Sequence, residues 1–245
     1  MGTAERTADG HRTAGGILSG LAVAVGCVLF LGGFAWAALL YQPYTVPTDS
    51  MEPTVNAGDR VLAERIDGGE VRRGDVVVFT DATWGDLPMI KRVVGVGGDK
   101  VVCCDAEGRL TVNGEALEEP YLRSAGPASP LEFTAPVPRG SVFLLGDQRN
   151  TSLDSREHLT DGDHGAVPVS AVSARVDASV WPMDSLGMVP RPVAFTDLPG
   201  GVSEPGPLRP LSLAVAAGVV LVLAGAAYGP VARRAGRRRT ERAGA

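Results

Sequence analysis

The stretch "MIKRVVGVGGD", residues 89–99, joins a run of β-branched side chains to a glycine-containing turn and predicts a β-strand that ends in a tight reversal. A lysine lies inside this apolar run at position 91, and Lys100 is the only other lysine of the chain. Burial disfavours the charged form of lysine, whereas arginine keeps its proton inside proteins. Lowering the pKa of Lys91 from near 10.4 to about 8 takes roughly 3 kcal/mol, which burial can supply. Lys91 is therefore a candidate base.

Short β-branched runs continue on both sides of this strand and predict a mainly β domain. Turn residues separate the runs, and Asn113-Gly114 is a strong hairpin signal. The other predicted strands are "RVLAERI" (60–66), "DVVVF" (75–79), "KVVC" (100–103), "RLTV" (109–112), "SVFLL" (141–145) and "AVSARVD" (171–177).

Two uncharged apolar blocks, residues 15–40 and 211–228, are long enough to be transmembrane helices, which need ~18 to 20 apolar residues. The alternative for the first block is a cleaved secretory signal, with Ala35-Trp36-Ala37 as a cleavage pattern. The block is longer than the ~7 to 15 residues of a signal's apolar core, which favours an uncleaved anchor. The predicted order is a tail (1–14), a transmembrane helix (15–40), a β-rich domain (41–182), an extended Pro-rich linker (183–210), a second transmembrane helix (211–228) and a basic tail (229–245).

Charge orients the predicted helices. Six arginines follow the second apolar block between positions 233 and 242, and positively charged flanks stay in the cytoplasm. Both tails are then expected inside and residues 41–208 outside. This outer segment has 14 Lys and Arg against 25 Asp and Glu, a balance of −11, which argues against nucleic acid as a partner. The basic tail instead suits anionic membrane lipid.

Ser50, in "VPTDSMEPT" (46–54), is the candidate nucleophile. A serine needs a base to attack a carbonyl, and the outer segment offers only two histidines, His158 and His164, in one acidic loop. Neither a G-x-S-x-G elbow nor an S-x-x-K motif surrounds Ser50. A Ser/Lys dyad with Lys91 remains. The alternative for Lys91 is a side chain that extends its ammonium group into water.

Together these segments resemble bacterial type I signal peptidases, which are membrane-bound serine proteases of the Ser/Lys type. Three ordered motifs carry the resemblance: "VPTDSMEPT", "IKRVVGVGGD" (90–99) and "GDQRNTSLDSR" (146–156). The resemblance implies an extracytoplasmic antiparallel β-rich domain flanked by transmembrane helices. It implies an endopeptidase of the bacterial cell membrane that needs no metal or cofactor. Its partners would be membrane lipid and the signal peptides of secreted preproteins, cut after small residues.

The resemblance also implies a role for each matching residue. Ser50 is the nucleophile and Lys91 the general base. Thr48 donates its hydroxyl to the oxyanion beside the Ser50 backbone N–H, and Ser152 hydrogen-bonds the Lys91 amine. Asp154 with Arg156, and Asp147 with Arg149, form an ion-pair scaffold beneath the dyad. Met51, Pro53 and Ile90 contact the substrate.

Some positions depart from the family pattern or remain open. Asp49 stands where the family usually has glycine, and aspartate tolerates positive φ better than most residues. The insert at 157–165 has histidines and aspartates that could bind a metal, but a solvated acidic loop is favoured. For the adjacent Cys103 and Cys104, two thiols are favoured over a bond between neighbours. The rival functions are a Ser/Lys autoprotease related to SOS-type repressors and a catalytically silent β domain that binds exported proteins.

Only nine residues separate Leu40, at the end of the first apolar block, from Ser50. A fully extended connection of that length spans at most ~35 Å. The sequence therefore predicts that the dyad works near the outer membrane surface, where the cleavage site of a signal peptide emerges from the bilayer.

Overall fold

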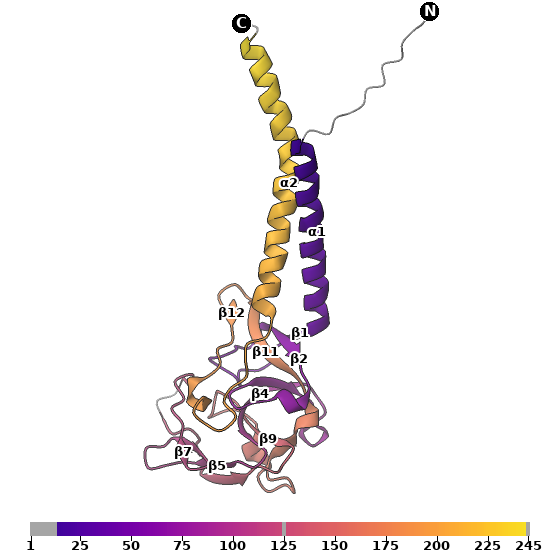
Figure 1. The fold of residues 1–245 in the computed structure, drawn as a ribbon. Helices are drawn as coiled ribbons and strands as arrows, with labels where there is room; N and C mark the ends of the chain where they lie inside the picture. The colour runs from indigo at the N-terminus through magenta and orange to yellow at the C-terminus, as the bar shows by residue number, and fades with distance from the viewer. Residues whose placement is uncertain (1–13, 124–125, 244–245) are drawn as a thin grey trace, which may run out of the picture. The chain divides into compact units, whose positions relative to one another are not determined.

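The computed structural model describes residues 14–123 and 126–243, and its chain divides into two units (Figure 1). One unit contains the N- and C-terminal helices, and the other spans Leu40–Gly206 and contains all the strands. This mainly antiparallel β architecture with an apolar helix at each end confirms the predicted fold class.

The helical unit consists of α1 (Ala14–Leu40) and α2 (Leu208–Ala243). Their apolar parts, Gly16–Leu40 and Leu208–Tyr228, have mean hydropathies of 2.3 and 2.2 and are long enough to cross a membrane. These spans agree with the predicted 15–40 and 211–228 to within three residues. The second helix continues beyond its apolar part, through residues that we expected to form a basic tail.

The two helices approach closely where both have glycine. A Cβ atom on Gly26 would lie 2.8 Å from the Gly218 carbonyl oxygen, closer than side chains can pack. The Ser19 hydroxyl donates a hydrogen bond of 2.7 Å to the carbonyl oxygen of Gly225. Small residues at a helix contact permit this approach and are typical of helix pairs in membranes.

The larger sheet of the β unit contains eight antiparallel strands in the order β1-β2-β11-β3-β4-β9-β10, with β12 paired to β11. Its central strands are buried on both faces, since every residue of β3 and six of the eight in β4 are buried. The bounds are β1 (Tyr41–Thr45), β2 (Arg60–Arg65), β3 (Val76–Phe79), β4 (Met89–Val96), β9 (Ser141–Leu145), β10 (Ala166–Pro168), β11 (Val172–Trp181) and β12 (Gly187–Met188).

A smaller sheet has the order β7-β6-β5-β8, with bounds β5 (Lys100–Cys103), β6 (Leu110–Val112), β7 (Glu115–Ala116) and β8 (Phe133–Pro136). Asn113 and Gly114 connect β6 to β7, with φ of 56° and 89°. Two successive positive φ angles are what a tight hairpin turn of this kind requires, so the predicted hairpin is confirmed.

The segment predicted as an extended linker packs onto the β unit instead. Its short helix η5 (Val193–Phe195) places the Phe195 ring at 0% exposure in the hydrophobic cluster that contains Leu145. The Ser203 hydroxyl donates to the buried carboxylate of Asp75 at 2.7 Å. The prolines of this segment hide any periodicity that would indicate packing, yet Phe195 and Leu198 between them are buried.

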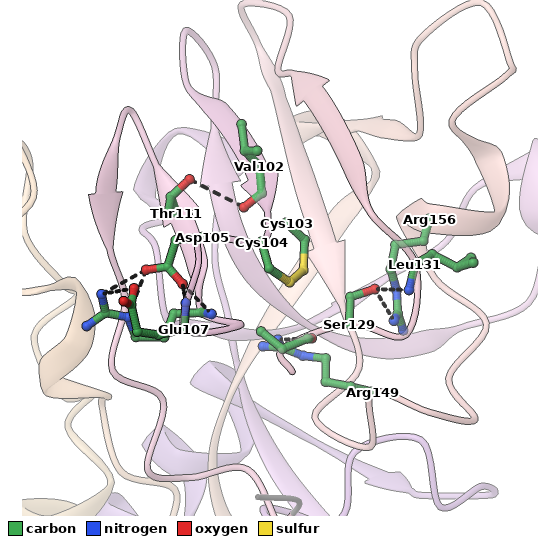
Figure 2. Close-up of a disulfide and its surroundings, with 12 residues drawn as sticks. Val102, Cys103, Cys104, Asp105, Glu107, Thr111, Ser129, Leu131, Arg149 and Arg156 are labelled. Carbon is green, nitrogen blue, oxygen red and sulfur yellow. Dashed lines mark hydrogen bonds and ion pairs between the residues drawn. A yellow bond between two sulfur atoms is a disulfide. The ribbon is translucent and has the colours of Figure 1, made fainter. Parts of the chain in front are cut away.

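Cys103 and Cys104 form a disulfide, which differs from the two thiols favoured from the sequence (Figure 2). Cys103 is the last residue of β5, and its buried side chain belongs to the same hydrophobic cluster as Leu110 and Phe133. The chain reverses directly afterwards, where the Asp105 N–H donates to the Arg109 carbonyl oxygen at 3.0 Å. β-Strand pairing and this reversal fix the backbone around both cysteines.

Candidate active site

Ser50 lies in the loop between β1 and β2, at the start of a compact turn. The Glu52 N–H donates to the Asp49 carbonyl oxygen at 2.9 Å, and the Val55 N–H donates to that of Met51 at 3.1 Å. A third bond, from the Gln148 N–H to the Ser50 carbonyl oxygen at 3.0 Å, ties this turn to the loop after β9. The serine side chain is therefore presented by a backbone that is held from two sides.

Lys91 lies on β4, where it pairs with Val77 of β3, and is 5% exposed. Its Nζ atom is 2.7 Å from Ser50 Oγ, although the two residues are 41 positions apart in the sequence. The alternative of an ammonium group that extends into water does not match this position. The structure thus brings together the two residues predicted to form the dyad.

Burial lowers the pKa of Lys91, because an ammonium group loses its hydration there. Nearby charges modify this effect: Asp154, Asp147 and Asp49 raise the pKa, and Arg156 lowers it. The direction of the overall shift favours the neutral amine, which has a free lone pair and can accept a proton.

The two hydroxyl groups predicted to support the dyad have different surroundings. Thr48 Oγ1 lies 3.2 Å from Ser50 Oγ, on the same turn. Ser152 is buried close to the turn, but its hydroxyl has no hydrogen-bond partner among the residues that the structure describes. The predicted bond from Ser152 to Lys91 is therefore not formed. The Ser152 backbone is fixed by its bond to the Gln148 carbonyl oxygen, 3.1 Å, and the Lys91 amine is directed at Ser50.

Asp154 and Arg156 form the predicted buried ion pair. Arg156 donates to both carboxylate oxygens of Asp154 through Nε and Nη2, each at 2.8 Å. The Gly146 N–H also donates to this carboxylate, at 2.9 Å. Arg156 reaches the Ser129 hydroxyl with Nη1 at 3.1 Å, a contact drawn in Figure 2. This pair holds the loop that follows β9 in a fixed conformation.

Asp147 is also buried and ion-paired, but its partner is Arg92, not the predicted Arg149. Arg92 donates to the two oxygens of Asp147 at 2.8 and 2.6 Å, and its guanidinium lies 4.2 Å from the centroid of the Tyr121 ring. Arg149 instead binds Glu119, at 2.6 and 3.0 Å. Alternation along β4 explains the difference, since Lys91 and Arg92 point to opposite faces of the strand.

Gly146 permits the close contact between the loop after β9 and the Ser50 turn. A Cβ atom at this position would overlap the Ser152 side chain and the Ser50 carbonyl oxygen. No side chain other than glycine's hydrogen fits there, so this residue controls how near the two loops come.

A cleft of about 270 Å³ opens beside the dyad. Both Met51 and Ile90, predicted to contact substrate, line it, whereas Pro53 does not. The exposed side chain of Leu153 adds an apolar edge. The lining residues are Val46, Pro47, Thr48, Asp49, Ser50, Met51, Pro88, Met89, Ile90, Lys91, Thr151 and Leu153.

Neither histidine of the acidic insert lines this cleft. The His158 ring stacks on Trp84, with ring centroids 4.5 Å apart, and its Nδ1 atom lies 2.9 Å from an Asp161 oxygen. Across residues 14–123 and 126–243, no three His, Cys, Asp or Glu side chains are grouped so that they could hold a metal ion.

Sequence reasoning missed Arg92, Tyr121, Glu119 and Leu153. Arg92 had a signal, because an arginine inside a β-branched run, next to a lysine, must find a partner when the strand is buried. Glu119 and Tyr121 lie in the loop between β7 and β8, and only the folded chain brings them near the site.

A β-sheet domain that holds a buried amine against a serine hydroxyl defines a class of serine hydrolases in which lysine takes the place of histidine. The chain belongs to the signal peptidase family, peptidase S26, whose family model matches residues 18–181. It is thus a serine endopeptidase of that family.

Several relatives share this family. The probable signal peptidase I of Mycobacterium leprae is 32% identical over 206 residues, which cover 60% of this chain and 71% of the relative. Signal peptidase I of Bacillus licheniformis is 36% identical over 132 residues, 50% of this chain and 69% of the relative. A crystal structure of a signal peptidase I from Enterococcus faecalis covers 43% of this chain and 95% of its own, at 28% identity and a TM-score of 0.36.

Proposed function

We propose that this protein removes N-terminal signal peptides from exported preproteins, with Ser50 as nucleophile and Lys91 as general base. The observation that carries the proposal is the distance of 2.7 Å between Lys91 Nζ and Ser50 Oγ, two residues that are both buried. Membership of the signal peptidase family supports the substrate class. The relatives that match this chain are named as signal peptidases I.

In the proposed reaction, the neutral Lys91 amine accepts the Ser50 hydroxyl proton while Oγ attacks the carbonyl carbon of the scissile bond. The oxyanion that forms receives hydrogen bonds from the Thr48 hydroxyl and the Ser50 backbone N–H. Lys91 then returns the proton to the leaving amine, which leaves an acyl-enzyme on Ser50. Water, deprotonated by Lys91, hydrolyses this ester and restores the serine.

The proposed location is the outer face of a bacterial cell membrane, with both ends of the chain in the cytoplasm. Two observations support it: both apolar helices are long enough to span a bilayer, and arginines follow the second apolar span. Membrane lipid is then the second partner. The apolar cleft lining formed by Met51, Ile90 and Leu153 is compatible with short, small side chains before the cut.

The test is cleavage of a preprotein by the purified, detergent-solubilised chain. Ser50→Ala and Lys91→Ala are each expected to reduce kcat/KM at least 10³-fold, as losses of nucleophile and base do in other serine hydrolases. His158→Ala, which alters a residue outside the cleft, is the matched control and keeps parental activity. Cleavage that survives both dyad substitutions would disprove the proposal and leave a catalytically silent binding domain.

A further inference from the structure

Asp49 places a carboxylate in the cleft between Thr48 and Ser50. Its side chain is exposed, and the residue lines the cleft beside the nucleophile. Among the described residues that line this cleft, only Asp49 and Lys91 have ionisable side chains. A bound substrate would therefore meet one uncompensated negative charge next to the scissile bond whenever Lys91 is neutral.

The turn does not need this carboxylate for its own structure. The charge of Glu52, on the same turn, is balanced by Arg123, whose Nη1 atom lies 3.2 Å from Glu52 Oε2. The Asp49 carboxylate has neither an ion pair nor a hydrogen bond within residues 14–123 and 126–243. Its backbone contributes a carbonyl oxygen to the turn, which any residue could supply, and its φ angle lies outside the left-handed region.

We propose that Asp49 selects substrates by charge, disfavouring acidic side chains next to the scissile bond and favouring neutral or basic ones. This proposal rests on the peptidase function proposed above. The positions concerned are the second residue before the cut and the first residue after it, because the first and third positions before the cut are expected to be small. Like charges a few ångströms apart repel, and the repulsion is stronger in a cleft than in open water.

The same charge acts on Lys91. The charged groups that act on the Lys91 amine are Asp154, Asp147, Arg156, which is paired with Asp154, and Asp49, which lines the cleft. Of these, Asp49 is the one exposed to substrate. Removing the Asp49 charge lowers the pKa of the Lys91 amine. In an Asp49→Asn variant, the rise of kcat/KM with pH should therefore begin at a lower pH, together with the change in substrate selectivity.

The experiment compares the full-length parent with Asp49→Asn on peptide substrates that differ only in having Glu, Gln or Lys at one of the two positions. For the parent, kcat/KM is expected to fall about two- to fourfold with each step from Lys to Gln to Glu at low ionic strength. In the Asp49→Asn variant, the kcat/KM values for the three substrates should differ by no more than about 1.5-fold. In 1 M salt, where the Debye length is about 3 Å, the kcat/KM values of the parent for the three substrates should become similar as well.

Glu115→Gln is the matched control, because it removes one exposed carboxylate from β7, away from the cleft. It should leave the parental preference unchanged. A parent without charge preference, or an Asp49→Asn variant that keeps it, overturns the assignment. A shift of the pH profile with unchanged selectivity overturns it too. If the parent cleaves none of the peptides in a Ser50-dependent manner, the peptidase function itself is wrong.

Discussion

Lys91 shows how a strand can place a lysine, usually a surface residue, where it suits the proposed role of base. Lysine usually keeps its ammonium group in water, but β4 is buried on both faces and directs the Lys91 side chain at Ser50. Its neighbour Arg92 points the other way and keeps its charge against Asp147. Burial thus affects two adjacent basic residues differently: it lowers the pKa of Lys91, whereas Arg92 keeps its charge because arginine does not lose its proton in proteins.

The burial of Lys91 predicts a definite pH dependence. Its pKa is lowered, and only the neutral amine accepts the serine proton, so kcat/KM should rise with pH through that pKa and level off above it. Lys91→Arg, which stays protonated, should be inactive across the range. Initial rates from pH 5 to 10 with a neutral peptide measure this. A flat profile, or an active arginine variant, contradicts the assignment of the base.

The sequence was informative about the dyad and less so about its partners. Ser50 and Lys91 could be predicted because three ordered motifs single them out and because the chain has only two lysines. The resemblance implied an ion pair of Asp147 with Arg149, but in the structure Asp147 pairs with Arg92 and Arg149 with Glu119. Pairing in the folded protein depends on which face of β4 a side chain occupies, and Arg92 occupies the face that Asp147 reaches.

At the scale of elements, the strands that were predicted lie in the interior of the sheets, and those that were missed lie at edges. β3 and β4 are runs of β-branched residues that neighbours cover on both sides. The strands β1, β8 and β10 each contain a proline, which weakens the sequence signal of a strand. All three are outermost in their sheets, where a missing N–H group is tolerated.

The packed segment after β12 should contribute to stability, as an extended linker would not. Phe195→Ala empties a fully buried position and is expected to lower the free energy of unfolding by about 3–5 kcal/mol. Val193→Ala, two residues earlier on the same short helix but 72% exposed, should change it by less than about 0.5 kcal/mol.

Denaturant unfolding of the β unit, followed by tryptophan fluorescence, measures both variants. If both substitutions change the free energy of unfolding equally, this segment does not pack against the β unit in solution.

For the whole molecule, the important property is that the β unit contains its own core. Each of the three hydrophobic clusters lies within Leu40–Gly206, and so do Ser50, Lys91 and every ion pair described around them. A unit with a complete core can fold alone. In the function proposed above, the two helices serve a different purpose, which is to keep the protein at a membrane.

A fragment of residues 40–206 is therefore expected to fold and to cleave a short soluble peptide with a kcat within about tenfold of the full chain. Its kcat/KM for a preprotein inserted in vesicles should drop much further, because the helices no longer raise the local concentration of enzyme at the bilayer. Parallel assays with both substrates test this. Equal losses on both substrates would show that the helices act on the chemistry itself.

Gly146 has a consequence for how the chain tolerates change. The absence of a side chain at Gly146 leaves room for the carbonyl oxygen of Ser50 and the side chain of Ser152, both of which a Cβ atom there would overlap. A scan of all twenty amino acids at this position should accept glycine alone, although the residue neither touches substrate nor exchanges a proton. Engineers who wish to reshape the specificity of the enzyme have freedom along the cleft wall and none at this point.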